Sequence, residues 1–157
     1  MTSIGFQFEQ DFIASLRCIP MVVRYKLDTA GVKLKLSHWH RFSQEERRQL
    51  AIAPCEDDTA VQAYREQLQA MVVRYFGQPA KTLDVVENPP WLNEAVPTAV
   101  AQQAAAHHLA VPPERWRQLT PLQRFVLIKL SRAGHENINF VPAMEEFGLG
   151  HGATEAG

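Results

Sequence analysis

Residues 57–77, DDTAVQAYREQLQAMVVRYFG, decide the fold class because they predict one long amphipathic helix with both ends marked. The Asp-Asp-Thr start can cap the helix, and its negative charges interact favourably with the positive amino end of the helix dipole. Gly77 followed by Pro79 ends the helix. An apolar stripe at helical spacing runs between these ends and predicts a buried face. The stripe consists of Val61, Tyr64, Leu68, Met71, Val72 and Tyr75.

Helix signals recur on both sides of this segment. Prolines, capping boxes and glycines divide the chain into helices joined by short connections. Residues 32–36 differ, because V-K-L-K-L alternates like a half-buried strand and predicts an extended connector or a short hairpin. The expected helices are Glu9–Leu16, Pro20–Gly31, Ser43–Pro54, Pro97–Leu109, Pro112–Trp116, Thr120–Gly134 and Ala143–Phe147.

These patterns predict an all-α fold, a compact helical bundle of about six to seven helices with at most a short extended segment near 32–36. The 157 residues, 46% of them hydrophobic, can fill one core without disulfides or a metal. We therefore expect a single helical domain over residues 1–149. Residues 150–157 have too little apolar surface to offset the entropy of ordering them, which predicts a mobile tail.

The chain also carries a repeated pattern. Residues 39–50 and 116–127 share W-x-x-Φ-[ST]-x-x-[EQ]-R-x-x-L, where Φ is a large apolar residue, at an offset of 77 that Pro20 and Pro97 also keep. Two interpretations stay open: two pseudo-repeated helical halves, or common helix-start residues used twice. The pentapeptide MVVRY, which occurs at 21–25 and 71–75, does not follow this offset, and we interpret it as two similar amphipathic helices.

The charge balance argues against polyanionic partners. Sixteen basic residues face 17 acidic ones, so the broad positive field that nucleic acids and anionic membranes favour is not indicated. A helix-turn-helix over Ser43–Phe76 stays a minor alternative, because its second helix has no basic cluster. The start resembles no signal peptide, and no run approaches the roughly 20 apolar residues that span a bilayer. Cys18 and Cys55 lack C-x-x-C spacing, and we expect free thiols in a cytoplasmic protein.

Candidate catalytic and metal-ligating residues are few. His38 and His40 would project to the same side of an extended segment, but a third ligand is missing nearby, which favours a polar surface beside Trp39. Cys18 beside Arg17 is a candidate reactive thiol, although a small core residue is the commoner role. The sequence contains no P-loop, GxGxxG, GxSxG, HExxH or EF-hand loop. We therefore expect a protein that is not an enzyme, with no metal site and no cofactor.

Three segments carry a family resemblance. The run F-x-F-E-x-D-F at residues 6–12, then L-R-C-I-P-M-V-V-R-Y-K-L-D at 16–28 and G-V-K-L-K-L-S-x-W at 31–39, resembles the conserved nitrate reductase-associated protein family. The likeness covers roughly residues 6–149. Members of this family are small proteins found chiefly in cyanobacteria, near genes for nitrate assimilation and molybdopterin synthesis. The resemblance implies an accessory factor that nitrate reductase needs for activity, and it assigns no catalytic residues.

We therefore expect a non-catalytic accessory protein that assists the assembly, molybdenum cofactor loading or stabilisation of nitrate reductase through protein–protein contact. The alternative from another class is a pterin-like small-molecule binder with a cleft against Trp91 and Trp116, and a metal or thiol redox protein is third. Charged residues near the N-terminal aromatic segment are candidates for partner contact, although the same mix is typical of a solvated helix face. These candidates are Arg17, Arg24, Lys26, Asp28, Lys33, Lys35, His38 and His40.

Overall fold

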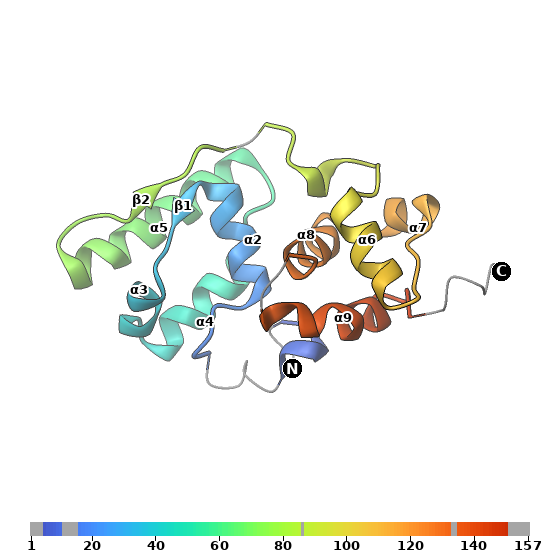
Figure 1. The fold of residues 1–157 in the computed structure, drawn as a ribbon. Coiled ribbons are helices and arrows are strands. Elements are labelled where there is room, and N and C mark those ends of the chain that lie inside the picture. The colour runs from blue at the N-terminus through green and yellow to red at the C-terminus, as the bar shows by residue number, and fades with distance from the viewer. Residues whose placement is uncertain (1–4, 11–15, 86, 133–134, 151–157) are drawn as a thin grey trace. The chain divides into compact units, whose positions relative to one another are not determined.

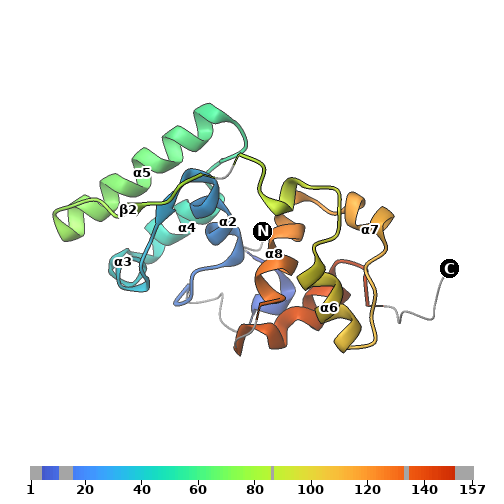
Figure 2. The same ribbon diagram turned by 45° about the horizontal axis from the view of Figure 1, so that its top comes forward.

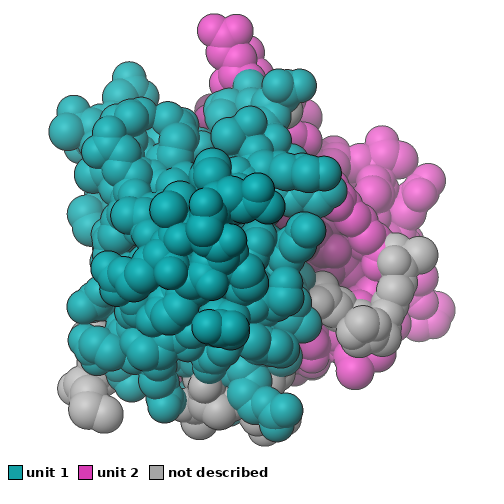
Figure 3. Space-filling view, turned by 90° about the vertical axis from the view of Figure 1, so that its left-hand side faces the viewer, with its two compact units in different colours: residues 1–5, 9–86 teal, residues 6–8, 87–157 magenta. Residues whose placement is uncertain are grey.

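The computed structural model describes residues 5–10, 16–85, 87–132 and 135–150. Within these ranges it contains eight α-helices, three short 3-10 helices and one two-stranded ribbon (Figures 1 and 2). The chain divides into two compact units, which Figure 3 colours separately. Unit 1 holds residues 1–5 and 9–86, and unit 2 holds residues 6–8 and 87–157. Each unit buries its own set of apolar side chains.

Unit 1 is built around α5 (Asp58–Phe76), the helix predicted from residues 57–77. The Asp57 carboxylate accepts from the Ala60 amide at 2.7 Å, and Gly77 ends the helix with a φ of 79°. Helices α2 (Met21–Ala30) and α3 (Leu36–Arg41) pack against α5, and α4 (Gln44–Ile52) packs against α2. The predicted apolar stripe therefore faces neighbouring helices.

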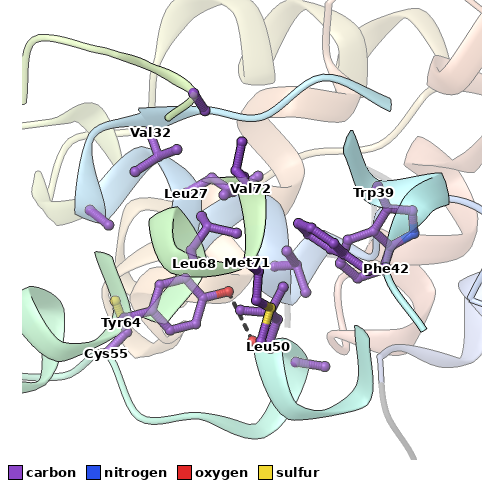
Figure 4. Close-up of a cluster of buried hydrophobic side chains, with 14 of the residues drawn as sticks. Leu27, Val32, Trp39, Phe42, Leu50, Cys55, Tyr64, Leu68, Met71 and Val72 are labelled. Atoms are coloured by element: carbon purple, nitrogen blue, oxygen red, sulfur yellow. Dashed lines mark hydrogen bonds between the residues drawn. The ribbon is translucent and has the colours of Figure 1, made fainter. Parts of the chain in front are cut away.

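The core of unit 1 contains two hydrogen-bonded aromatic side chains (Figure 4). The Tyr64 hydroxyl donates to the Leu50 carbonyl oxygen at 2.9 Å, and Trp39 Nε1 donates to the Leu16 carbonyl oxygen at 2.7 Å. Both polar atoms are thus satisfied where water is excluded. Other apolar residues of this core include Leu27, Val32, Phe42, Leu68, Met71 and Val72.

A two-stranded antiparallel ribbon joins β1 (Val32–Lys33) to β2 (Lys81–Thr82), with Val32 opposite Thr82 and Lys33 opposite Lys81. This confirms the short extended segment and supplies a partner strand that the sequence did not indicate. Gly31, with a φ of 74°, turns the chain from α2 into β1. A Cβ atom there would lie 2.9 Å from the Leu83 carbonyl oxygen, so the turn requires glycine.

Unit 2 is centred on α8 (Pro121–Leu130), which lies within the predicted helix Thr120–Gly134. Its neighbours are η2 (Pro90–Leu92), α6 (Thr98–Ala106), η3 (His135–Asn139) and α9 (Phe140–Glu146). The buried side chains of α8 include Phe125, Val126, Leu127 and Leu130. Helix α7 (Pro113–Gln118) adds a fully buried Trp116, while η1 (Gln7–Glu9) has its first two residues in this unit.

The helices of unit 2 repeat those of unit 1. Helices α6, α7 and α8 each start 77 residues after α2, α3 and α4, respectively. Pro20 and Pro97 are the N-cap residues of α2 and α6, and capping boxes at Ser43 and Thr120 start α4 and α8. The predicted offset is therefore kept by whole elements of secondary structure.

Tertiary contacts are duplicated as well. Trp39 and Trp116 each donate from Nε1 to the carbonyl oxygen 23 residues earlier in the chain, at 2.7 and 2.9 Å. Arg47 donates from Nε to the Trp39 carbonyl oxygen, and Arg124 donates in the same way to Trp116, both at 3.0 Å. Because a capping box requires none of these contacts, the structure supports two pseudo-repeated halves over the alternative interpretation.

The all-α fold class is confirmed, with eight α-helices in the described ranges against the six to seven expected. None of these helices is long and apolar enough to cross a membrane. The predicted helix Glu9–Leu16 falls mainly on residues 11–15, and the predicted tail falls mainly on residues 151–157; both lie outside the described residues. One domain over residues 1–149 stays a prediction.

Three local expectations were wrong. The helix predicted over Thr120–Gly134 ends at Leu130, with Ser131 as its C-cap residue. Residues 37–41 form part of α3 instead of an extended segment, because the amide of Lys35 donates to His38 Nδ1 at 3.1 Å and starts a helical turn. The alanine-rich helix ends at Ala106 instead of Leu109, because His108 adopts a φ of 59°. A left-handed residue at this point ends a helix.

Candidate functional site

All eight residues predicted for partner contact lie in unit 1, and they fall into two groups by exposure. The exposed residues can contact a partner directly, whereas the partly buried residues already make contacts within unit 1. Arg17, Lys33, Lys35 and His40 are exposed, and Arg24, Lys26, Asp28 and His38 are partly buried.

Lys26 is held inside unit 1. Its ammonium donates to the carbonyl oxygens of Ala51, at 2.7 Å, and Ala53, and it lies 5.9 Å from the centre of the Tyr64 ring. Burial lowers the pKa of Lys26. The cation therefore closes the carboxyl end of α4, where the helix leaves carbonyl groups without amide partners. This role accounts for its charge without a partner protein.

Arg24 and Asp28 lie on the same helix, α2. Arg24 donates from Nε to the Ile19 carbonyl oxygen at 3.1 Å, across the start of the helix. Asp28 is partly buried and already interacts with another group of the protein. Neither residue is as accessible as Lys33 or Lys35 on the following segment.

The two histidines of S-H-W-H-R do not share a ligand. His38 accepts from the Lys35 amide through Nδ1, and His40 Nε2 lies 3.1 Å from the Arg17 carbonyl oxygen, to which it donates. Burial, followed by the charge of Lys35, lowers the pKa of His38. Residues two apart on a helix point about 200° from each other, so α3 separates the rings that an extended segment would align. Among the described residues, no group of three or more His, Cys, Asp or Glu side chains could hold a metal ion.

The strongest candidate site lies where α3 meets the carboxyl end of α5. His38 packs edge-on against the Phe76 ring at 4.7 Å, and the Arg41 guanidinium lies 5.8 Å from the centres of the Tyr75 and Phe76 rings. Phe76 nonetheless keeps 38% of its surface exposed and its neighbour Val73 keeps 43%. We call this surface the α3–α5 patch and define it by Lys35, His38, Arg41, Val73, Arg74 and Phe76.

A carboxylate beneath the patch fixes its shape. Glu46 accepts from the Tyr75 hydroxyl at 2.6 Å and from the exposed Arg74 at 3.2 Å, while also accepting from the Ser43 amide in the capping box of α4. Burial raises the pKa of Glu46, but the hydrogen bonds from Tyr75 and Ser43 and the charge of Arg74 outweigh it and lower the pKa overall. The carboxylate therefore stays ionised and holds the end of α5 in place.

The ribbon beside the patch places two like charges opposite each other. Lys33 and Lys81 are cross-strand partners, and both side chains are exposed. Directly opposed like charges destabilise a ribbon. Lys33 is followed by Leu34 and Lys35 and so continues directly into α3. The cations thus extend from the ribbon to the α3–α5 patch.

The cysteines proposed for a redox role and the tryptophans proposed for a pterin-like ligand lie outside the α3–α5 patch. Cys18 is exposed and Cys55 is buried, and burial raises the pKa of the Cys55 thiol. Trp116 is fully buried and donates to the Asn93 carbonyl oxygen, while Trp91 packs edge-on against Phe125 at 5.1 Å. Trp116 therefore offers no ring face to a pterin-like ligand. An open hollow of about 330 Å³ in unit 2 has other lining residues, namely Gln7, Phe8, Pro142, Glu145 and Glu146.

Sequence reasoning missed four members of the patch: Arg41, Val73, Arg74 and Phe76. Phe76 follows the buried Val72 by one helical turn, so its periodicity predicts burial instead of exposure. One signal was present in the sequence: α3 carries His38 and Arg41, and the last turn of α5 carries Arg74 next to aromatic residues. This signal acquires meaning once α3 is known to pack against α5.

A family model described as conserved nitrate reductase-associated protein matches residues 5–147, from η1 to the end of α9. No curated protein and no solved structure matches the chain.

Proposed function

The chain belongs to the conserved nitrate reductase-associated protein family, and on this ground we propose that it serves nitrate reductase as a non-catalytic accessory protein. The family match carries this proposal because it covers elements of both units. The accessory role consists of assembly, molybdenum cofactor loading or stabilisation of the reductase through direct contact. The free thiols Cys18 and Cys55 fit a reducing compartment, and we place the function in the cytoplasm.

The exposed residues Lys33 and Lys35 support contact with a protein partner. Their side chains are directed to solvent, in contrast to Lys26, whose charge is used within unit 1. Charged groups around an interface steer association and set specificity more than they set affinity. The contact therefore responds to charge reversal at these two lysines.

The direct test is recovery of nitrate reductase from nitrate-grown cells by the tagged chain. The wild type recovers the reductase, Lys33→Glu/Lys35→Glu recovers less, and Arg117→Glu/Arg132→Glu, two exposed positions in unit 2, serves as the matched control. Failure of the wild type to recover the reductase, under conditions in which the purified chain is folded, contradicts the proposal. If the wild type and both double variants recover equal amounts of the reductase, the contact does not involve Lys33 and Lys35.

A deletion strain separates the three accessory steps. Loss of nitrate reductase activity with normal amounts of the reductase and low molybdenum per enzyme indicates cofactor loading. A reduced amount of the reductase indicates stabilisation, and an undersized complex on gel filtration indicates assembly. Full activity in the deletion strain contradicts all three.

A further inference from the structure

We infer that the α3–α5 patch and the adjacent Lys33–Lys81 pair form a docking surface for an acidic protein segment that also carries an apolar side chain. This inference rests on the proposed function and names the surface and the chemistry of the partner. The occupant is a segment of nitrate reductase that has net negative charge and places an aromatic or aliphatic residue against Phe76.

The free chain bears an electrostatic cost at the ribbon. Lys33 and Lys81 face each other across β1 and β2, an arrangement that disfavours pairing until an anion lies between the two ammonium groups. Val32 is buried beside Lys33, so the register cannot shift by one residue without exposing Val32 and burying Lys33. The ribbon therefore holds both cations on its exposed side.

The α3–α5 patch combines positive charge with exposed ring surface. The Arg41 guanidinium lies 5.8 Å from the centre of the Phe76 ring, and the exposed Arg74 precedes Phe76 by two residues on α5. Arginine and aromatic side chains dominate the energetic centres of protein interfaces. Glu46, the carboxylate that pairs with Arg74 at 3.2 Å, also accepts hydrogen bonds from Tyr75 and Ser43 beneath the surface. An external acid therefore completes the charge balance here.

The repeat acts as an internal control for the role of these cations. The residues of unit 2 at the positions of Lys33, Lys35 and Arg41 are Ala110, Pro112 and Gln118, so the second copy builds the same helices without these cations. Arg115, which stands at the position of His38, donates to the Gly148 carbonyl oxygen at 2.8 Å.

The helix that carries part of the patch in unit 1 is also longer than the corresponding helical segment of unit 2. At the 77-residue offset, the start of α5 corresponds to the start of η3 at His135, and the end of α9 at Glu146 corresponds to Gln69 in α5. The last turn of α5, with Val73, Arg74 and Phe76, has no helical counterpart among the described residues of unit 2. Because the shared fold forms without the cations and this extra length, their presence in unit 1 points to a role other than folding.

The affinity test uses the purified full chain and purified nitrate reductase in isothermal titration calorimetry. Lys33→Glu/Lys81→Glu keeps two like charges across the ribbon, so it leaves stability unchanged while it reverses the surface. We expect this variant and Phe76→Ala to bind about tenfold more weakly than the wild type. The matched controls in unit 2, Arg117→Glu/Arg132→Glu and Ile138→Ala, bind like the wild type. Thermal unfolding confirms that each variant is folded.

The chemistry of the partner is tested by photo-crosslinking with benzoylphenylalanine in place of Phe76, or in place of the exposed Ile138 as the control. The inference expects a crosslink from position 76 to a reductase peptide with net negative charge. A crosslink to a neutral or basic peptide overturns it, as does stronger binding of a 12-nucleotide oligothymidylate or of phosphatidylglycerol vesicles.

The outcomes separate this inference from the proposed function. Wild-type binding that the patch variants leave unchanged overturns the docking surface while the accessory role stands. If the wild-type chain neither binds the reductase nor crosslinks to it from either position, the proposed function fails and the docking surface fails with it.

Discussion

Arg124 donates from Nε to the backbone carbonyl oxygen of Trp116 at 3.0 Å, and its guanidinium lies 6.0 Å from the centre of that tryptophan's ring. The same guanidinium donates to the carbonyl oxygens of Arg117 and Trp91. One buried side chain thus joins η2, α7 and α8 in unit 2.

Replacing this arginine should destabilise unit 2. Arg124→Ala leaves three carbonyl groups without their donor, and we expect a loss of about 3 kcal/mol in the free energy of unfolding. Arg124→Lys recovers little of it, because one ammonium cannot reproduce the planar fork of donors. Urea unfolding followed by circular dichroism measures both changes. Arg132→Ala, at an exposed position, should change the stability by less than about 0.5 kcal/mol, and a similar loss there would contradict the prediction.

His108 occupies the repeat position of Gly31, and both residues have positive φ, 59° and 74°. Because a side chain strains the left-handed conformation, His108→Gly should stabilise the protein by about 1 kcal/mol. His107→Gly is the control, since His107 has a φ of −107° and gains nothing from glycine. Thermal unfolding of the two variants should shift the midpoint in opposite directions. Equal shifts would show that the strain at His108 is negligible.

Lys81→Glu should stabilise the ribbon, because it replaces a like-charged cross-strand pair with an opposite one. We expect a gain of about 0.5 kcal/mol at low salt, and most of it should disappear in 1 M NaCl, where the Debye length falls to about 3 Å. Denaturant unfolding at both salt concentrations measures the gain. Lys81→Gln separates relief of repulsion from new attraction, and a gain that salt does not change would rule out a charge effect.

Glu46 should make the protein less stable in acid. Its pKa is lowered in the folded state, so its contribution is complete above its ordinary value of 4.5 and is lost as the pH falls through the folded value. Glu46→Gln keeps the capping box, as Gln123 does in unit 2, but loses the charge. We expect the wild type to exceed this variant by about 1 kcal/mol at pH 7 and to lose that advantage as the pH falls below 4.5.

Unfolding in urea at pH 7, 5 and 3 measures the difference between the two proteins. Glu45→Gln, at the exposed neighbouring position, is the control and should differ from the wild type by less than about 0.5 kcal/mol at each pH. A Glu46 difference that stays constant with pH would contradict the prediction.

The parts of the fold that follow local rules were predictable. The stripe of α5 and the capping boxes of α4 and α8 depend on residues within a few positions of one another, and the helices begin where these signals lie. Helix α3 was missed because its first turn is closed by His38 Nδ1, a bond that no common capping pattern predicts. Strand β2 was missed because Lys81 and Thr82 are two exposed residues, which become a strand through pairing with β1.

The candidate site was predictable in part. Lys33, Lys35 and His38 were candidates because charge clusters beside aromatic residues in that segment of the sequence. Phe76 lies 38 positions after His38 in the chain, and their contact depends on α3 packing against α5. Lys26 was also a candidate for partner contact, but its ammonium donates to a carbonyl group of a neighbouring helix. Residue type alone could not separate these two outcomes.

The repeated tryptophan gives each half of the protein its own optical reporter. Trp39 is enclosed in unit 1, while Trp91 and Trp116 belong to unit 2, and these are the three tryptophans of the chain. With phenylalanine in place of Trp39, all indole emission originates from one half. Stopped-flow traces of that variant and the unmodified chain would therefore reveal which half melts first, without any attached dye.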